Sequence, residues 1–397
     1  MRLAIVASHP VQYYAPLFRE LAKRLDLTVF YGHRATPHDQ AQAGFGVGFD
    51  WDIDLLSGYT HEFLRNVSAV PALDRFAGVD TPEIGRRLRA GRFDAVLLTG
   101  WRLKCDHQAL WAAKRMRIPV LVRGDSHLDT PRAAWKRCAK AIAYPIFLRS
   151  FDGALIVGAR NRAYWQHYGY PETRMFDSPH CIDNAWFAAR ATLEARSDLR
   201  ERLGIDPETK LVLFAGKLLP FKRPLDLIEA AALARGAGEV VEVLVAGAGP
   251  LESELRTRAR VLGVPAHFLG FCNQTEMPAV YAASDLLVLP SDGNETWGLV
   301  VNEALACGRP VLVSDAVGST PDLVAHLGEE IVFPMANVGV MAERLQEIIA
   351  SPLDYHSMEL VRSRFSLQMA GEGVITALSY CSHSDMRGIA HAESRIH

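Results

Sequence analysis

The stretch Pro290-Ser-Asp-Gly-Asn-Glu-Thr-Trp-Gly-Leu-Val-Val-Asn-Glu303 decides the fold of this chain. The apolar run 286–289 before it predicts a buried strand that ends in a polar loop. We expect a helix to begin near Gly298 and to end at Gly308, and the apolar run 311–313 predicts a second strand directly afterwards. A strand, a helix and a strand in this order indicate a parallel sheet.

Two glutamates stand eight positions apart in this stretch, Glu295 in the loop and Glu303 about two turns into the helix. The unpaired N–H groups and the dipole at a helix N-terminus make the loop suitable for an anion. Glu295 suits hydrogen bonds from sugar hydroxyls, and Glu303 suits a ribose diol. The segment therefore predicts a holder for a nucleoside-diphosphate sugar. The alternative is a chance spacing, with Glu303 an ordinary exposed helix residue.

In this setting the segment resembles the signature of the retaining, glycogen-synthase-like glycosyltransferases of family 4, which have the GT-B fold. The shared pattern is a glutamate, a Gly-Leu-Val helix start, a second glutamate and a Gly-x-Pro-Val strand, here Glu295, 298–300, Glu303 and 308–311. The resemblance implies an α/β protein with two Rossmann-like, doubly wound domains that face each other across a cleft. It covers the C-terminal half strongly and the N-terminal half loosely.

A basic turn follows the apolar run 211–215, with Lys217 and Lys222 five positions apart. The family has an arginine and a lysine at this spacing, both on the diphosphate, so the resemblance implies that role for the two lysines. Lys217 departs from the pattern, because lysine is a point charge and does not grip a phosphate bidentately. Arg223 is a candidate to compensate. The alternative is a solvated basic turn.

The resemblance also implies the rest of the donor site. The backbone after the Gly-Phe pair at 270–271 meets the nucleotide base in the family, and the loop and helix start around Glu295 meet the sugar and the phosphates. The implied donor-binding residues are Lys217, Lys222, Phe271, Cys272, Glu295, Thr296, Trp297, Gly298, Leu299 and Glu303.

In the N-terminal half, the segment Val-Arg-Gly-Asp-Ser-His at 122–127 ends another apolar strand, where α/β folds bind ligands. His127 matches the histidine that closes over the donor sugar in relatives, so the resemblance implies a catalytic set of His127, Lys222 and Glu295. The alternative for His127 is a structural histidine.

The segment Ser-His-Pro-Val-Gln-Tyr-Tyr at 8–14 follows the first predicted strand. It lacks the Gly-Gly phosphate loop of most relatives and resembles a bacterial subgroup that begins His-Pro-x-Gln-Tyr-Tyr. His9 and Gln12 are candidates to meet the acceptor or the donor phosphate. The alternative is a capped turn between a strand and a helix.

Composition narrows the class of protein. The chain has 397 residues, 49% hydrophobic and 22% charged, which suits two ordinary globular domains. A net charge of −2 gives no basic bias toward nucleic acid. Six cysteines without a Cys-x-x-Cys pair indicate neither zinc nor a disulfide framework. The apolar run 3–7 is too short for a signal peptide or a membrane span, so we expect a cytoplasmic location.

We expect neither a metal ion nor a cofactor. The pair Asp52-Ile-Asp54 matches the Asp-x-Asp metal motif of the other main glycosyltransferase fold, but it lacks the context of that fold.

Strand and helix patterns alternate along the chain and predict four segments. An acceptor-binding domain is expected at 1–185 and a nucleotide-sugar-binding domain at 186–355. A helix at 356–381 crosses back onto the first domain in GT-B enzymes, and the polar residues 382–397 are expected to be disordered.

The sequence thus predicts a retaining, metal-independent glycosyltransferase. It would move a sugar from a nucleoside-diphosphate sugar to a hydroxyl of a carbohydrate or lipid-linked acceptor, in surface polysaccharide or glycolipid biosynthesis. Two alternatives stay open: a nucleotide-sugar 2-epimerase of the same fold, and a non-catalytic sugar-nucleotide-binding protein.

One surface feature bears on the acceptor. The segment 132–149 interleaves basic residues with Trp135, Tyr144 and other apolar residues. This mixture suits peripheral contact with the inner face of a membrane. The alternative is a helix that packs its apolar face on the sheet and solvates its charges.

Overall fold

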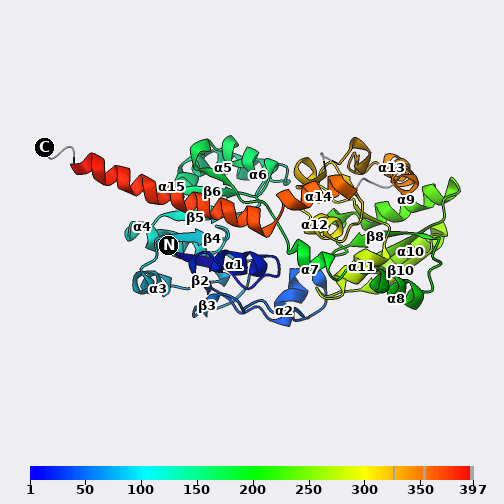
Figure 1. Ribbon diagram of the computed structural model, residues 1–397, viewed down its shortest axis with the longest axis horizontal. Helices are drawn as coiled ribbons and strands as arrows, with labels where there is room; N and C mark the ends of the chain where they lie inside the picture. Colours follow the sequence, from blue (N-terminus) through cyan, green and yellow to red (C-terminus); the bar gives the residue numbers. More distant parts are fainter. Residues whose placement is uncertain (325–326, 352–354, 394–397) are drawn as a thin grey trace.

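Two parallel β-sheets form the two lobes of the protein, which lie side by side in the computed structural model (Figure 1). The structure describes residues 1–324, 327–351 and 355–393. The N-terminal lobe contains a seven-stranded sheet in the order β3-β2-β1-β4-β5-β6-β7. The C-terminal lobe contains a six-stranded sheet in the order β10-β9-β8-β11-β12-β13. Helices follow the strands in both lobes, which confirms the predicted α/β class.

The inner strands of the N-terminal lobe are short apolar runs that are buried on both faces, as parallel strands covered by helices must be. β1 lies inside the sheet and pairs with β2 and β4. The strands are β1 (Arg2–Ala7), β2 (Asp26–Tyr31), β3 (Thr60–Phe63), β4 (Ala95–Leu98), β5 (Val120–Arg123), β6 (Gly153–Ile156) and β7 (Met175–Asp177).

The helices of this lobe are α1 (Tyr14–Ala22), α2 (Pro37–Gln40), α3 (Ile84–Gly91), α4 (Lys104–Arg115), α5 (Ala134–Phe147) and α6 (Ala159–His167), with short helical turns η1 (Ala41–Phe45), η2 (Phe76–Gly78), η3 (Leu148–Ser150) and η4 (Glu172–Arg174).

In the C-terminal lobe the strands are β8 (Lys210–Ala215), β9 (Val241–Ala246), β10 (Ala266–Gly270), β11 (Leu286–Leu289), β12 (Val311–Ser314) and β13 (Val332–Phe333). The helices are α7 (Asn184–Ala188), α8 (Leu193–Leu203), α9 (Pro224–Gly236), α10 (Glu252–Leu262), α11 (Met277–Ala283), α12 (Leu299–Ala306) and α13 (Val338–Ala350), with the turns η5 (Pro220–Lys222), η6 (Thr320–Val324) and η7 (Glu329–Ile331).

The chain returns to the first lobe through α14 (Tyr355–Arg364) and α15 (Leu367–Glu393), which runs along the N-terminal lobe in Figure 1. Its buried residues Val374 and Leu378 belong to the same apolar cluster as Leu3 and Ile5 of β1. The expected disorder of 382–397 does not match the helix, which continues to Glu393. The residues from 382 onward contain helix formers such as alanine, arginine and glutamate and no proline. Residues 394–397 lie outside the described part of the chain.

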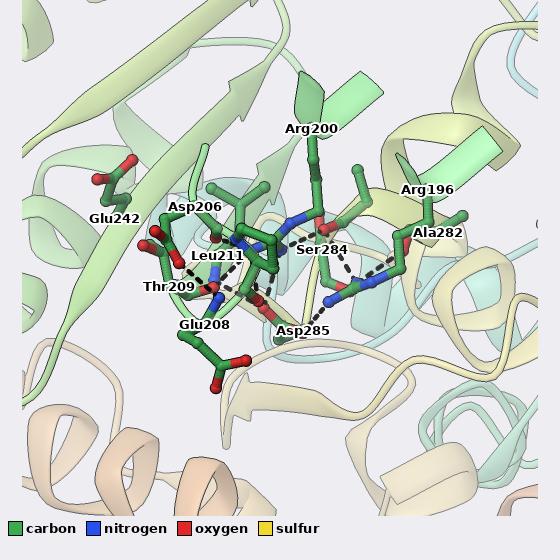
Figure 2. Close-up of polar contacts among 12 residues, drawn as sticks. Arg196, Arg200, Asp206, Glu208, Thr209, Leu211, Glu242, Ala282, Ser284 and Asp285 are labelled. Carbon is green, nitrogen blue, oxygen red and sulfur yellow. Dashed lines mark hydrogen bonds and ion pairs between the residues drawn. The ribbon is translucent and has the colours of Figure 1, made fainter. Parts of the chain in front are cut away.

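A buried arginine fixes the start of β11 (Figure 2). Arg200 of α8 donates to the carbonyl oxygens of Ala283 and Thr209 at 3.0 and 2.6 Å. Its neighbour Arg196 pairs with Asp285 at 2.7 Å, and Asp285 also accepts from the backbone N–H of Leu211 in β8 at 2.8 Å. These contacts tie α8 and the end of α11 to β8 and β11, the two strands whose loops carry the cavity described below.

No helix among the described residues is both long and apolar enough to cross a membrane.

Candidate functional site

A cavity of about 640 Å³ lies between the two lobes. The carboxyl ends of β8, β9 and β11 border this cavity, and open α/β sheets bind ligands at these ends. The N-terminal lobe closes it with Gln12, Tyr13, Asp125 and His180. All of the implied donor-binding residues line this one cavity: Lys217, Lys222, Phe271, Cys272, Glu295, Thr296, Trp297, Gly298, Leu299 and Glu303.

The loop after β11 and the turn after β8 meet in an ion pair between Lys222 and Glu295. The same carboxylate oxygen of Glu295 accepts from the Ser291 hydroxyl at 3.2 Å. Both charged side chains are mostly buried, at 13% and 11% exposure. Arg223, the candidate to compensate for Lys217, instead donates to Asp226 at 2.7 Å and is not a lining residue of the cavity.

Lys217 is the second cation of the cavity. Its ammonium lies 4.3 Å from the centre of the Phe45 ring of the N-terminal lobe. Burial lowers the pKa of Lys217, and the neighbouring charge of Lys222 lowers it further. Two cations therefore stand close together on one wall, an arrangement that an incoming anion such as a diphosphate stabilises.

Glu303 projects from α12 into the same cavity, where its carboxylate accepts a hydrogen bond from the Tyr281 hydroxyl at 2.6 Å. Burial raises the pKa of Glu303 to about 7, although the hydrogen bond from Tyr281 opposes this shift. Glu303 is therefore not an ordinary exposed helix residue.

The N-terminus of α12 opens onto the cavity through Gly298. Gly298 has a φ of 88°, and a Cβ atom there would lie 2.7 Å from a side-chain carbon of Leu289, so a side chain would be strained and crowded. Thr296 donates to Asp125 of the other lobe at 2.7 Å. The Trp297 ring lies 5.3 Å from the His180 ring. The loop that carries Glu295 is thus bound directly to the N-terminal lobe.

An aromatic cluster closes the cavity around Phe271, which follows β10. The Phe49 ring lies 4.0 Å from the Phe271 ring, and Phe45 lies 5.5 Å from it. Asn273 donates to the backbone oxygen of Asp50 at 2.8 Å, which extends the contact between the lobes. We did not predict Phe45 and Phe49 as site residues. The sequence feature that could have indicated them is the glycine-rich aromatic segment 44–51.

The candidate site residues of the N-terminal lobe lie in different places relative to the cavity. Gln12 lines the main cavity, and His9 lines a smaller recess beside it. The side chain of His127 is 1% exposed and lies near Asp129 and Thr130, and it is absent from the described lining of both spaces. Asp125, two residues earlier, lines both.

The carboxylates of the Asp-x-Asp pair bind protein groups. Asp52 accepts from the backbone N–H of Thr275 at 3.2 Å, and Asp54 accepts from those of Leu56 and Ser57. In the described part of the chain, no three His, Cys, Asp or Glu side chains are grouped so that they could hold a metal ion.

Residues 195–360 match the family described as glycosyl transferases group 1. This match and the two facing sheets together identify the domain and the fold. The chain carries a glycosyl transferases group 1 domain within a GT-B fold. The match confirms the family resemblance of the C-terminal half of the sequence.

Two curated relatives each match less than half of the GT-B chain. A D-inositol 3-phosphate glycosyltransferase of Streptomyces bingchenggensis is 36% identical over 171 residues, which cover 40% of this chain and 37% of that protein. One from Mycolicibacterium gilvum is 40% identical over 134 residues, 32% of this chain and 29% of that protein. The chain thus spans little more than a third of these relatives at most.

Solved structures match nearly the whole GT-B chain at low identity. Anabaena HepE in complex with UDP has a TM-score of 0.72 at 16% identity, and the match covers 96% of this chain and 100% of that one. WaaG, a glycosyltransferase involved in lipopolysaccharide biosynthesis, has a TM-score of 0.62 at 17% identity, with 91% and 94% covered. These likenesses show the fold.

Proposed function

We propose that this protein is a retaining glycosyltransferase that moves a sugar from a nucleoside-diphosphate sugar to an acceptor hydroxyl. One observation carries the proposal: Lys222, Glu295 and Glu303 meet in one cavity at the N-terminus of α12. Two cations and a helix N-terminus suit a diphosphate, and two carboxylates of different surroundings suit two sets of hydroxyls.

The donor would lie along this wall. Its diphosphate would contact Lys217, Lys222 and the N-terminus of α12, and its ribose diol would contact Glu303. The base would lie against Phe271 and the backbone of Cys272, and the transferred sugar would lie toward Glu295. Because HepE was solved with UDP, we choose UDP as the first nucleotide to test.

The chemistry needs no metal ion in this proposal. The bond from the anomeric carbon to the β-phosphate oxygen breaks, and the acceptor oxygen bonds to the same face of that carbon. The acceptor proton passes to the departing phosphate oxygen. Lys222 and the helix dipole stabilise the charge that grows on this oxygen. Closure of the two lobes excludes water, which would otherwise hydrolyse the donor.

His127 remains a prediction within this scheme. The resemblance assigns it to the donor sugar, yet its side chain is buried outside the cavity lining. It could touch the sugar only after a shift of the 125–130 loop. In the described conformation it supports the segment that holds Asp125 in the cavity.

Donor binding tests the proposal most directly. Glu303→Ala should weaken UDP and UDP-sugar alike by about 1.5–3 kcal/mol, the range for hydrogen bonds to a charged group. Isothermal titration calorimetry of both proteins with UDP measures this. The exposed Glu254 of α10 provides a matched Glu→Ala control that should bind as wild type. Equal UDP affinities in wild type and Glu303→Ala would contradict the assignment of Glu303 to the ribose diol.

One assay distinguishes glycosyl transfer from the two alternative functions. An epimerase converts the donor sugar when no acceptor is present, and a binding protein leaves the donor intact under every condition. A glycosyltransferase requires the acceptor for rapid release of UDP. NMR of the labelled donor sugar, with and without a mixture of candidate acceptors, distinguishes the three.

We also propose that the acceptor is lipid-linked and that α5 contacts the inner face of a membrane. None of the residues of α5 is buried, and Trp135, Ile142 and Ile146 are 69%, 78% and 76% exposed. Tyr144 and Phe147, near the end of the helix, pack against the apolar core of the lobe, whereas these three side chains stay exposed. The basic residues around them are Arg132, Lys136, Arg137 and Lys140. Such a mixture suits anionic headgroups with aromatic and aliphatic groups at the interface.

Sedimentation with phosphatidylglycerol vesicles at low and high salt tests this contact. Each basic residue near an anionic surface contributes about 1 kcal/mol. The variant Lys136→Glu, Arg137→Glu, Lys140→Glu should lose most of the binding, whereas Arg256→Glu, Arg260→Glu on α10 should not. Binding that is insensitive to salt and to the α5 variant would favour a soluble acceptor.

A further inference from the structure

A recess of about 150 Å³ opens beside the main cavity, at the carboxyl ends of β1, β4 and β5. Since a water molecule takes about 30 Å³, it has room for a group of about five heavy atoms. Tyr13, Asp125 and His180 line both the recess and the main cavity, so the two spaces meet at these side chains. The other polar lining residues of the recess are Ser8, His9, Tyr14 and Thr99.

Several polar groups of this recess have spare hydrogen-bonding capacity. His180 is 4% exposed, and its Nδ1 has no partner in the described structure. One carboxylate oxygen of Asp125 accepts from Thr296, and no donor within the described residues reaches the other. A buried polar group without a hydrogen-bond partner is unfavourable, so a ligand that supplies both donors and acceptors would be stabilised here. Hydroxyl groups do both.

The charges in the recess restrict what can enter it. No lysine or arginine is among its described lining residues. Burial lowers the pKa of His9 to about 4, with a further contribution from His33, and burial together with Arg123 lowers the pKa of His180. Both rings are therefore neutral near pH 7.

Arg123, a buried cation at the end of β5, is occupied elsewhere. Its guanidinium donates to the backbone oxygens of Ser178 and Pro179 at 3.2 and 2.8 Å. Asp125 is thus the charged side chain that faces the recess. A phosphate there would meet a carboxylate and no available cation, and burying an uncompensated anion is strongly unfavourable.

We propose that this recess is the acceptor subsite and that it takes an uncharged polyhydroxyl group. Asp125 accepts hydrogen bonds from hydroxyls beside the reacting one, and His180 pairs with another. The inference rests on the proposed glycosyl transfer and specifies its acceptor. The curated relatives are named for inositol 3-phosphate, whereas here the hydroxyl-bearing edge of the acceptor that enters the recess carries no phosphate.

Saturation-transfer NMR on the full chain saturated with UDP tests the proposal. The probes are myo-inositol, methyl α-glucoside and myo-inositol 3-phosphate. We expect at least one neutral probe to bind at least tenfold more tightly than the phosphorylated one. Asp125→Asn, which can still accept the bond from Thr296, should weaken the neutral probe about tenfold. Asp129→Asn, on the same loop but outside both linings, should leave it unchanged.

Three results would overturn the proposal: tighter binding of inositol 3-phosphate, equal binding of the neutral probe to wild type and Asp125→Asn, or no binding of any neutral probe. Calorimetry on the same samples measures UDP affinity and distinguishes a failure of the acceptor proposal from a failure of the proposed glycosyl transfer. If UDP itself does not bind, the proposed glycosyl transfer fails and not merely its acceptor.

Discussion

Lys222 and Glu295 form an ion pair that joins the turn after β8 to the loop after β11. The pair is mostly buried, and Ser291 donates a further hydrogen bond to the same carboxylate. If Lys222 binds the donor diphosphate, then Glu295 and the diphosphate compete for one ammonium group. Donor binding would release the carboxylate of Glu295 to accept from the sugar.

Glu295→Gln should therefore separate nucleotide binding from catalysis. We expect free UDP to bind at least as tightly as in wild type, because the competing carboxylate is gone. Turnover of the UDP-sugar should fall at least tenfold, because the hydroxyls of the sugar lose a charged acceptor. Calorimetry with UDP and steady-state assays with the UDP-sugar measure the two effects. A large loss of UDP affinity would instead assign Glu295 to the nucleotide.

Lys222→Ala should lower kcat more than donor affinity. Charge on the diphosphate grows as the glycosidic bond breaks, so the ammonium group is worth more in the transition state than in the ground state. Loss of one such group reduces kcat by about 10²–10³. Lys210→Ala, at the exposed start of β8, is the control. EDTA should not change the wild-type rate. Activity lost in EDTA and restored by manganese would implicate Asp52 and Asp54.

The pKa of Glu303 predicts a pH-dependent stability. Burial raises this pKa from 4.5 to about 7, so the folded protein holds the proton more tightly than the unfolded chain. The resulting stabilisation is complete below pH 4.5 and is lost as the pH rises through about 7. Glu303→Gln stays neutral. Its free energy of unfolding should rise relative to wild type by up to about 3 kcal/mol between pH 4.5 and 8. Urea titrations without nucleotide measure this, and a constant difference would contradict it.

Arg200→Met should reduce the stability of the C-terminal lobe. The substitution leaves the carbonyl oxygen of Thr209 without its donor and that of Ala283 with Arg196 as its remaining donor, at a cost of about 3 kcal/mol. Arg202→Met, at an exposed position on the same helix, should cost little. Urea unfolding compares the two. UDP affinity of the folded Arg200→Met protein should match wild type, because Arg200 does not line the cavity.

The C-terminal half was the easier part to predict. Its strands are continuous apolar runs, and the expected run 286–289 coincides with β11. Its candidate site residues lie on the loops that follow the strands and on the first two turns of α12, so a local motif can indicate them. Strands such as β7 and β13, with three and two residues, are too short to give a pattern.

The N-terminal part of the site resisted prediction for a different reason. Tyr13, Asp125 and His180 lie far apart in sequence, and only the parallel sheet brings them together. A motif also cannot fix which way a side chain points. In a regular strand, residues two apart face the same side, so a departure from strand geometry in this loop decides which of them reaches the ligand. In this structure Asp125 lies in the cavity and His127 is buried.

The return of α15 to the N-terminal lobe has a consequence for how the protein is made. Ala370, Val374 and Leu378 complete the core around β1, yet they are translated after the whole C-terminal lobe. The lobe that leaves the ribosome first therefore keeps an uncovered apolar groove until α15 is synthesised. A gene cut between the two lobes would encode an N-terminal fragment that lacks part of its own interior. Expression of that lobe by itself calls for the α15 peptide to be supplied in trans or fused to it.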